Sequence, residues 1–441
     1  MTPALDALYL FVLAVLSPWL LWRGLRTGRY RTDMRAKLLG DVPTLPPGEP
    51  VVWFHGVSVG EVHLLTTLVA AYRRRHPSRR VVVSATTDTG LAEARTRFAD
   101  CTVVPFPFDF SFAAGRAIAR LKPGLIVLAE SELWPNFLAV AARRGVPVAV
   151  VNGRMSPRSF ARLSRVARPA RWLLYRHVKL LAMQSDDYAA RLKLLGVPAA
   201  KIVVTGSVKY DGAAADRDTP KARELRRLLA VPVGVPVLVV GSTHAPEEAI
   251  LLDVFRRLRE RTPALRMVLV PRHPDRFEEV AALVAASGFD WHRRSRIATP
   301  LGAMPAVILL DTIGELGAAW SLATVGFTGG SLDGRRGGQS MIEPAGYGVP
   351  TTFGPHVWNF RDAARSLVEV GGAVVARDAA ELVGVVERWL HDEAARSTAG
   401  AAARAFVVAQ RGATGRTLDA LDGLLPGERR VSARRSDLEC D

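Results

Sequence analysis

Short apolar runs alternate with amphipathic stretches along the first half of the chain. The apolar runs lie at 51–55, 81–85, 125–129, 146–151 and 180–183, and helical patterns of apolar positions cover 61–75 and 133–144. Such short runs without polar alternation are typical of strands buried on both faces of a parallel sheet. The pattern therefore predicts repeated βαβ units in a doubly wound α/β sheet.

The same pattern starts again after a break. Residues 211–220, DGAAADRDTP, are small and polar, which is typical of a linker. Further apolar runs follow at 237–241, 267–271, 307–310, 324–330 and 349–353. We therefore expect two Rossmann-like domains, 31–210 and 211–425, which bind ligands at the carboxyl ends of their strands in a cleft between them. The basic residues 426–441 are expected to form a disordered tail.

The N-terminal segment is apolar. Residues 7–22 carry no charge, although the segment is somewhat short for a membrane-spanning helix of roughly 20 residues and contains Pro18. Basic residues follow it: Arg23, Arg26, Arg29, Arg31, Arg35 and Lys37. We expect residues 1–30 to be a membrane anchor with the body on the cytoplasmic side. A single span, a tilted anchor, an interfacial helix and a buried first helix all stay open.

The net charge narrows the classes of partner. The chain has 59 basic and 42 acidic residues, a formal charge of +17, which favours nucleic acid, an anionic membrane or a phosphorylated substrate. Seven basic residues with interleaved apolar ones occupy 158–179. This segment predicts contact with membrane lipids, the alternative being a solvated helix face. We expect no nucleic-acid partner, because the sequence has no recognition module and only 7% aromatic residues.

The sequence carries no strong metal-ligand motif. It contains no HExxH and no Cys-His cluster. Its two cysteines, Cys101 and Cys440, are too few for a disulfide framework or a cysteine-based metal site. We expect neither a metal nor a cofactor.

The first apolar run leads directly into the loop GVSVGE, residues 56–61. Ser58 and Glu61 match a capping box, in which the glutamate caps its own helix and has a structural role only. In the alternative interpretation, Glu61, which follows Gly60, lies at the ligand site and acts as a general base. The spacing alone leaves both interpretations open.

Other strand ends also carry polar residues. Thr312–Glu315 and Ser340–Glu343 match capping boxes that are expected to open helices, and the second follows the glycine-rich loop 329–338. Helix N-termini bind phosphate or carboxylate. Further candidates follow three other strands: Ser242, Thr243 and His244; Arg272 and His273; and Glu130 and Glu132. Each also has an ordinary structural interpretation as a cap or a solvated side chain.

The ordered set of motifs resembles a known family. The chain reads HGVSVGEV, ESELWPNF, NGRMSPRSF, QSDDYAARLKLLGV, TGSVKYD, GSTHAPEE, LVPRHPDRF, DTIGEL and GGSLDGRRGGQSMIEPAGYGVPTTFGPHVWNF. In this order the motifs resemble those of the 3-deoxy-D-manno-octulosonic acid (Kdo) transferases of lipid A biosynthesis. The resemblance covers roughly residues 30–420.

This resemblance implies a GT-B glycosyltransferase with the acceptor in the first domain and CMP-Kdo in the second. It implies an enzyme on the cytoplasmic side of the inner membrane that transfers Kdo to a lipid A precursor of the lipid IVA type, with inversion and release of CMP. Its proton acceptor would be Glu61. The CMP contacts would be Pro271, Arg272, Ile313, Gly314, Glu315, Ser340, Met341, Ile342 and Glu343, and secondary contacts Ser58, Gly60, Glu132, Lys209, Ser242, Thr243 and His273.

One segment departs from the family pattern. Many relatives have GGHNPLEP where this chain has GGQSMIEP, so that Gln339, Ser340 and Met341 replace His, Asn and Pro. Two alternatives stand beside Kdo transfer, and this departure bears on the second. The first is another GT-B sugar-nucleotide enzyme, either a UDP-sugar transferase or a 2-epimerase. The second is a catalytically silent relative that binds at the membrane surface.

Overall fold

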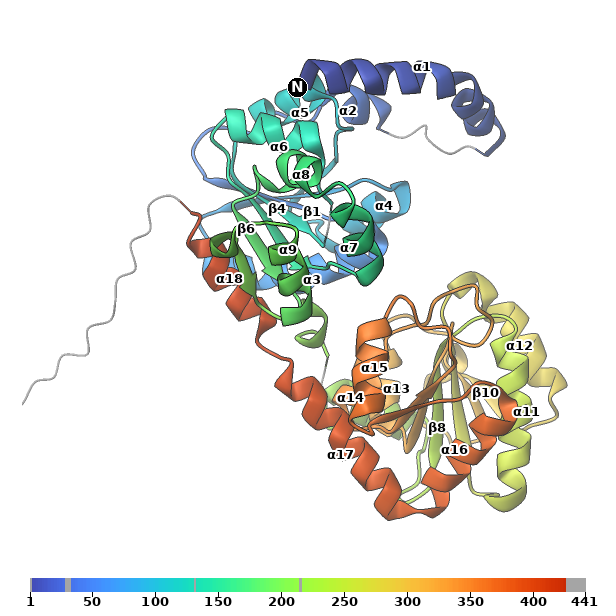
Figure 1. Cartoon of the computed structure of the whole chain (residues 1–441). Coiled ribbons are helices and arrows are strands. Elements are labelled where there is room, and N and C mark those ends of the chain that lie inside the picture. Colours follow the sequence, from blue (N-terminus) through green and yellow to red (C-terminus); the bar gives the residue numbers. More distant parts are fainter. Residues whose placement is uncertain (1, 28–32, 131, 214–215, 426–441) are drawn as a thin grey trace, which may run out of the picture. The chain divides into compact units, whose positions relative to one another are not determined.

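The computed structural model describes residues 2–27, 33–130, 132–213 and 216–425. The chain divides into two compact units (Figure 1). The first unit comprises Met1–Asp211 and Arg411–Asp441, and the second comprises Gly212–Gln410. Residues 411–425, which we expected in the second domain, therefore lie with the first. The predicted tail 426–441 lies outside the described residues.

The first unit contains a seven-stranded parallel sheet in the order β3-β2-β1-β4-β5-β6-β7. The strands are β1 (Val51–His55), β2 (Arg80–Ala85), β3 (Thr102–Pro105), β4 (Pro123–Ala129), β5 (Val148–Gly153), β6 (Leu180–Met183) and β7 (Ile202–Val204). β1 is buried along its whole length because its side chains alternate between two cores. This confirms the predicted doubly wound sheet.

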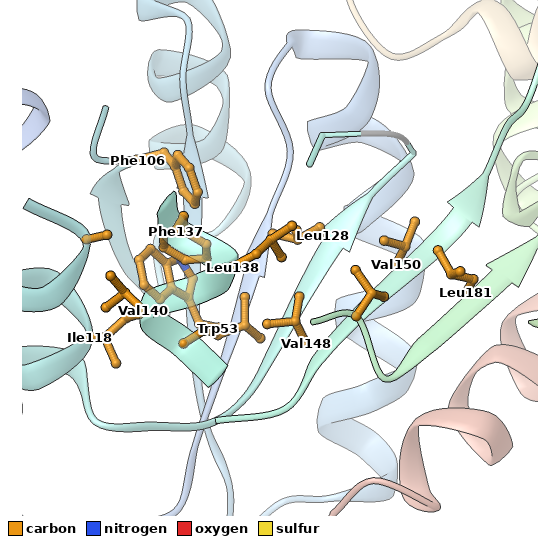
Figure 2. Packing of buried hydrophobic residues seen from close by; sticks show 14 of the residues in the cluster. Trp53, Phe106, Ile118, Leu128, Phe137, Leu138, Val140, Val148, Val150 and Leu181 are labelled. Atoms are coloured by element: carbon orange, nitrogen blue, oxygen red, sulfur yellow. The ribbon is translucent and has the colours of Figure 1, made fainter. Parts of the chain in front are cut away.

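Helices cover both faces of this sheet. They are α1 (Thr2–Thr27), α2 (Met34–Leu39), α3 (Val59–Arg75), α4 (Asp88–Arg97), α5 (Ser111–Leu121), α6 (Pro135–Arg143), α7 (Pro157–Ser164), α8 (Ala167–Ala170), α9 (Asp186–Leu194) and α18 (Ala413–Asp422), with short turns η1 (Arg171–Tyr175), η2 (Ala199–Lys201) and η3 (Val208–Tyr210). On one face, α5, α6 and α9 pack on a core that includes Trp53, Phe106 and Phe137 (Figure 2). On the other face, α3, α4 and α18 pack on Val52 and Phe54.

The second unit repeats the architecture, with strand order β10-β11-β9-β8-β12-β13-β14, all parallel. Its strands are β8 (Val237–Thr243), β9 (Arg266–Pro271), β10 (Trp291–Arg293), β11 (Val307–Leu309), β12 (Val325–Thr328), β13 (Thr351–Phe353) and β14 (Ala373–Val375). Its helices are α10 (Pro220–Leu228), α11 (Glu247–Arg261), α12 (Phe277–Ala286), α13 (Leu316–Leu322), α14 (Ile342–Gly346), α15 (Arg361–Glu369), α16 (Ala379–His391) and α17 (Glu393–Ala409), with turns η4 (Pro274–Arg276) and η5 (Arg294–Arg296). Cores on both faces of the sheet confirm the second Rossmann-like domain.

The first helix is attached to the first unit by polar contacts. The Asp6 carboxylate accepts hydrogen bonds from the backbone N–H and the hydroxyl of Ser111, and the Tyr9 hydroxyl donates to Asp109 over 3.2 Å. Apolar side chains beyond these contacts are exposed, among them Phe11 at 68% and Val15 at 61%.

The predicted N-terminal membrane anchor is not supported by a spanning helix. Within the described residues, no helix combines the length and the apolar character needed to cross a bilayer. The side chains of Arg23, Arg26, Arg29 and Arg31, which were expected to flank the anchor, lie outside the described part of the structure.

The basic segment 158–179 does not form one amphipathic helix. It is broken into α7, α8 and the single π-helical turn η1, and an exposed Val166 separates the first two pieces. Arg176 lies 4.2 Å from the centroid of the Trp172 ring. The segment therefore presents its basic residues from several short helical turns.

Candidate active site

In each sheet the strand order changes direction beside the first strand, and such points are where doubly wound sheets bind ligands. In the first unit the reversal lies between β1 and β4, which pair in parallel. In the second unit it lies between β8 and β12. The candidate residues of the first unit lie after β1, β4 and β7, and those of the second unit lie at or after the ends of β8, β9, β11 and β12, so each unit carries its own half-site of candidate residues.

Glu61 lies in the first turn of α3, directly after β1. Its carboxylate accepts a hydrogen bond from the backbone N–H of Val57, whereas the Ser58 side chain makes no capping hydrogen bond. The Ser58 half of the predicted capping box therefore does not form, and Glu61 binds the backbone one residue before the N-cap. Burial raises the pKa of Glu61 to about 7, against the opposing effect of the Val57 amide. A carboxylate with such a pKa is suited to accept a proton near neutral pH.

Two further carboxylates act on Glu61 from the end of β4. The charges of Glu130 and Glu132 both contribute to its raised pKa. Burial, followed by the charge of Glu130, raises the pKa of Glu132 itself. Glu130 has a φ of 58°, a left-handed conformation that costs a non-glycine residue energy and that often occurs at functional sites. The structure thus brings Glu61 near the ESELWPNF motif.

Lys209 balances this negative charge. Its Nζ lies 3.3 Å from Oε1 of Glu130. The turn that carries it, η3, is held by Asn152, whose buried side chain accepts a hydrogen bond from the Val208 N–H over 3.1 Å. The sequence analysis did not single out Asn152. Asn152 follows an apolar run directly and begins the motif NGRMSPRSF, and this position could have identified it as a candidate.

The second half-site begins at the ends of β8 and β9. The Arg272 N–H donates to the Thr243 carbonyl over 3.0 Å, which joins the two strand ends. The rings of His244 and His273 lie edge to face, 5.2 Å apart. Burial, followed by the charge of His273, lowers the pKa of His244 to about 4. His244 is therefore a neutral imidazole at neutral pH.

The glycine-rich loop 329–338 follows β12 and closes on itself. The Gly338 N–H donates to the Gly330 carbonyl over 2.7 Å, and the Gln339 N–H donates to Gly329 over 3.0 Å. The side-chain nitrogen of Gln339 then lies 3.2 Å from Nε2 of His244. Because an amide nitrogen can only donate, this Nε2 accepts and the imidazole proton is assigned to Nδ1.

The other two predicted capping boxes do not form. α13 begins at Leu316 and α14 at Ile342, so Thr312 and Ser340 are not N-caps. Instead, the Thr312 hydroxyl donates to Glu315, and Glu315 pairs with Arg294 at 2.9 Å. The turn before α13 leaves Ile313 83% exposed and gives Gly314 a φ of 84°.

Glu343 is half-buried in α14. Burial raises its pKa, and the positive charge of Arg272 opposes this effect. Arg272 therefore lies close enough to Ser340–Glu343 to act on it electrostatically, whereas Pro271 is buried at the end of β9. Within the described residues, no group of three or more His, Cys, Asp or Glu side chains is arranged to hold a metal ion.

These features define a protein of two Rossmann-like units, each with polar residues at the carboxyl ends of its parallel strands. A putative UDP-N-acetylglucosamine 2-epimerase from Listeria monocytogenes has the same fold, with a TM-score of 0.56 and 13% identity over 87% of this chain and 98% of that one. The family model for 3-deoxy-D-manno-octulosonic acid transferases matches residues 26–212.

The 3-deoxy-D-manno-octulosonic acid transferase of Bordetella pertussis is 36% identical over 437 residues, which cover 95% of this chain and 99% of that protein. The C-terminal CMP-Kdo binding domain of WaaA from Acinetobacter baumannii is 31% identical over 43% of this chain and 96% of that domain, with a TM-score of 0.40. The chain belongs to the 3-deoxy-D-manno-octulosonic acid transferase family, as its motifs predicted.

Proposed function

We propose that this glycosyltransferase transfers Kdo from CMP-Kdo to a hydroxyl of a lipid A precursor, with inversion and release of CMP. The observation that carries the proposal is the Glu61 carboxylate. It is partly buried at the reversal point of the first sheet, with a pKa of about 7. A base with this pKa is half ionised at neutral pH and is a strong enough base to assist an alcohol.

In the proposed reaction the acceptor oxygen attacks the ketosidic carbon of Kdo from the side opposite CMP. Glu61 takes the hydroxyl proton as the new carbon–oxygen bond forms. The bond between that carbon and the phosphate oxygen breaks, and its electron pair leaves with CMP. Attack opposite the leaving group inverts the anomeric centre. The Lys209–Glu130 pair, at 3.3 Å, supplies the fixed charges beside the base.

The donor is assigned to the second unit. Arg272 is exposed at the end of β9 and can neutralise the single phosphate of CMP, assisted by the polar segments Ile313–Glu315 and Ser340–Glu343. Gln339 and Ser340 stand where many relatives have His and Asn. Gln339 contacts His244. We therefore assign to Gln339 and His244 together the donor contacts that the family's histidine would make. This proposed mechanism uses no metal and no cofactor.

We also propose attachment to the cytoplasmic face of the inner membrane. The exposed apolar side chains of α1 are suited to lie in the bilayer interface while Asp6 and Tyr9 hold the helix to the first unit. A cavity of about 750 Å³ in the first unit supports lipid contact by the basic segment. It is lined by Arg168, Pro169, Arg171, Trp172, Tyr175, Arg176, Gly196, Pro198 and Lys201, none of them acidic.

Nucleotide choice separates the proposal from its rivals. The purified protein is incubated with a tetraacyl lipid A precursor and either CMP-Kdo or UDP-N-acetylglucosamine. We expect CMP release that depends on the precursor, and no reaction of the UDP-sugar. Release or epimerisation of the UDP-sugar instead would favour another enzyme of this fold. Binding of precursor vesicles without any turnover would favour a catalytically silent relative.

A further inference from the structure

Two adjacent carboxylates are buried on α11, and they have different partners. Glu247 and Glu248 are both 0% exposed. Glu248 has an ordinary ion pair, with Nη1 of Arg276 at 2.5 Å from its Oε1. Glu247 instead accepts hydrogen bonds from four backbone N–H groups. A buried carboxylate is costly unless its oxygens are satisfied, so these four bonds fix its position firmly.

Three of the four amides belong to the glycine-rich loop. Oε2 of Glu247 lies 2.6 Å from the Gly330 nitrogen and 3.1 Å from that of His244. Oε1 lies 2.8 Å from the Ser331 nitrogen and 3.1 Å from that of Leu332. One carboxylate therefore ties the end of β8 to the loop after β12, across the reversal point of the second sheet.

The residue before this contact has to be small. A Cβ on Gly329 would lie 2.7 Å from the Ser242 carbonyl oxygen and 2.8 Å from Oε2 of Glu247. The loop backbone can approach the carboxylate only because this side chain is absent. On the far side of the loop, the Asn359 side chain donates to the Arg336 carbonyl over 2.8 Å.

The held loop places side chains at the donor half-site. It delivers Gln339 to the ring of His244 and leads directly into Ser340. Arg336 is exposed on the same loop, and its charge acts on both His244 and His273. On a mobile loop these side chains would lose conformational entropy each time a nucleotide binds, and binding would be weaker. A loop that is already fixed avoids this loss.

We propose that Glu247 is a positioning residue for the nucleotide: by holding the amides of Gly330, Ser331 and Leu332 it fixes the loop that presents Arg336, Gln339 and Ser340 to CMP. The inference rests on the proposed function, because it assumes that the donor is a cytidine nucleotide. Glu247 itself is buried beneath the loop and touches no substrate.

The test compares Glu247→Gln with Glu248→Gln in the full-length protein. Glutamine at 247 turns an N–H₂ group toward backbone N–H groups, so about half of the four bonds are lost. Calorimetry with CMP alone is expected to show roughly tenfold weaker binding by Glu247→Gln. Hydrogen exchange of residues 330–339 is expected to quicken. Glu248→Gln removes an equally buried charge on the same helix but should leave both readouts at the wild-type level.

Two results would overturn the inference. One is CMP binding by Glu247→Gln equal to wild type despite faster exchange in the loop. The other is the same loss in both variants, which would assign Glu247 to general stability. If Glu247→Gln does not fold, Glu247→Asp keeps the charge but is one methylene too short to reach all four amides, and the same comparison applies. Wild-type protein that binds UMP but not CMP would instead contradict the proposed function.

Discussion

Lys209 forms the ion pair with Glu130 beside the base Glu61, its Nζ lying 3.3 Å from the Glu130 carboxylate. The first half-site thus contains three carboxylates, Glu61, Glu130 and Glu132, and one of them has a cation of its own. Burial, followed by the charges of Glu130 and Glu132, raises the pKa of Glu61. The ion pair therefore holds one of the two carboxylates whose charge acts on Glu61.

Replacing Glu61 separates catalysis from helix capping. Glu61→Gln keeps an oxygen that can accept the Val57 N–H but cannot take a proton. We expect kcat to fall by ~10²–10⁴-fold. The pKa of Glu61 is higher in the folded protein than in the unfolded chain. Ionisation of Glu61 therefore lowers the free energy of unfolding as pH rises to about 7. Thermal melting of the variant at pH 8 should therefore match or exceed that of wild type, and a large loss of stability would assign Glu61 to capping.

The pH dependence of turnover should report the same carboxylate. A general base works only when ionised, so kcat is expected to rise with pH and level off above an apparent pKa of about 7. Release of CMP under saturating substrates, measured from pH 5 to pH 9 (a range of roughly two units either side), gives the profile. In Glu61→Gln this ascending limb should vanish from the residual activity. If kcat still rises with pH in Glu61→Gln, the rise reports the ionisation of another residue.

Removing the cation of the pair should make Glu61 harder to ionise. In Lys209→Met the charge of Glu130 is no longer balanced, so the pKa of Glu61 is expected to rise further and kcat at pH 7 to drop by about tenfold. The ascending limb should move to higher pH, and Lys209→Arg should restore it. Lys193→Met, which removes an exposed lysine from α9, serves as the control. If kcat falls in Lys209→Met but its rise with pH stays at the wild-type position, Lys209 has a role other than balancing the charge of Glu130.

Two adjacent arginines of the glycine-rich loop should differ in their effect on the donor. The charge of Arg336 helps to lower the pKa of both His244 and His273, and the neighbouring Arg335 is also exposed. Because CMP-Kdo carries a phosphate and a carboxylate, we expect Arg336→Ala to raise KM for the donor by roughly tenfold. Arg335→Ala should change it little. Equal effects of both variants would indicate only a diffuse positive field.

Lipid binding should depend on the basic cavity. The variant Arg168→Gln/Arg171→Gln/Arg176→Gln removes three of its lining charges. At about 1 kcal/mol per basic residue near an anionic surface, its affinity for phosphatidylglycerol vesicles should fall roughly a hundredfold. Flotation measures this, with Arg74→Gln/Lys221→Gln/Arg226→Gln as an exposed control of equal charge. Equal flotation of both variants would exclude the cavity as a lipid site.

The sequence predicted both sheets because their central strands are buried on two faces. The run at 51–55, for instance, has no polar alternation to obscure it. The capping boxes at Thr312 and Ser340 were wrong because a four-residue pattern does not reveal where a helix starts, and α13 and α14 begin later than the pattern indicates. Helix α18 was placed with the wrong domain, since its attachment to Asp211 is a long-range contact.

The sequence singled out candidate residues at strand ends but not the contacts that support them. Arg272 and the segment 340–343 were found through motifs at strand ends, and the structure places both in the second half-site. The support by Glu247 was missed because three of its four partners are backbone amides 83 to 85 positions away, which no side-chain pattern encodes. Asn152 was missed for the same reason, since it holds Lys209 through a backbone N–H.

Mass spectrometry of the product made on a defined tetraacyl lipid A precursor tests the central claim most directly. With wild-type enzyme and CMP-Kdo, the account predicts precursor that has gained Kdo, together with an equal amount of free CMP. Glu61→Gln, folded and able to bind CMP, should leave the precursor unmodified over the same time. Unmodified precursor with the wild-type enzyme, or full conversion by Glu61→Gln, would contradict it.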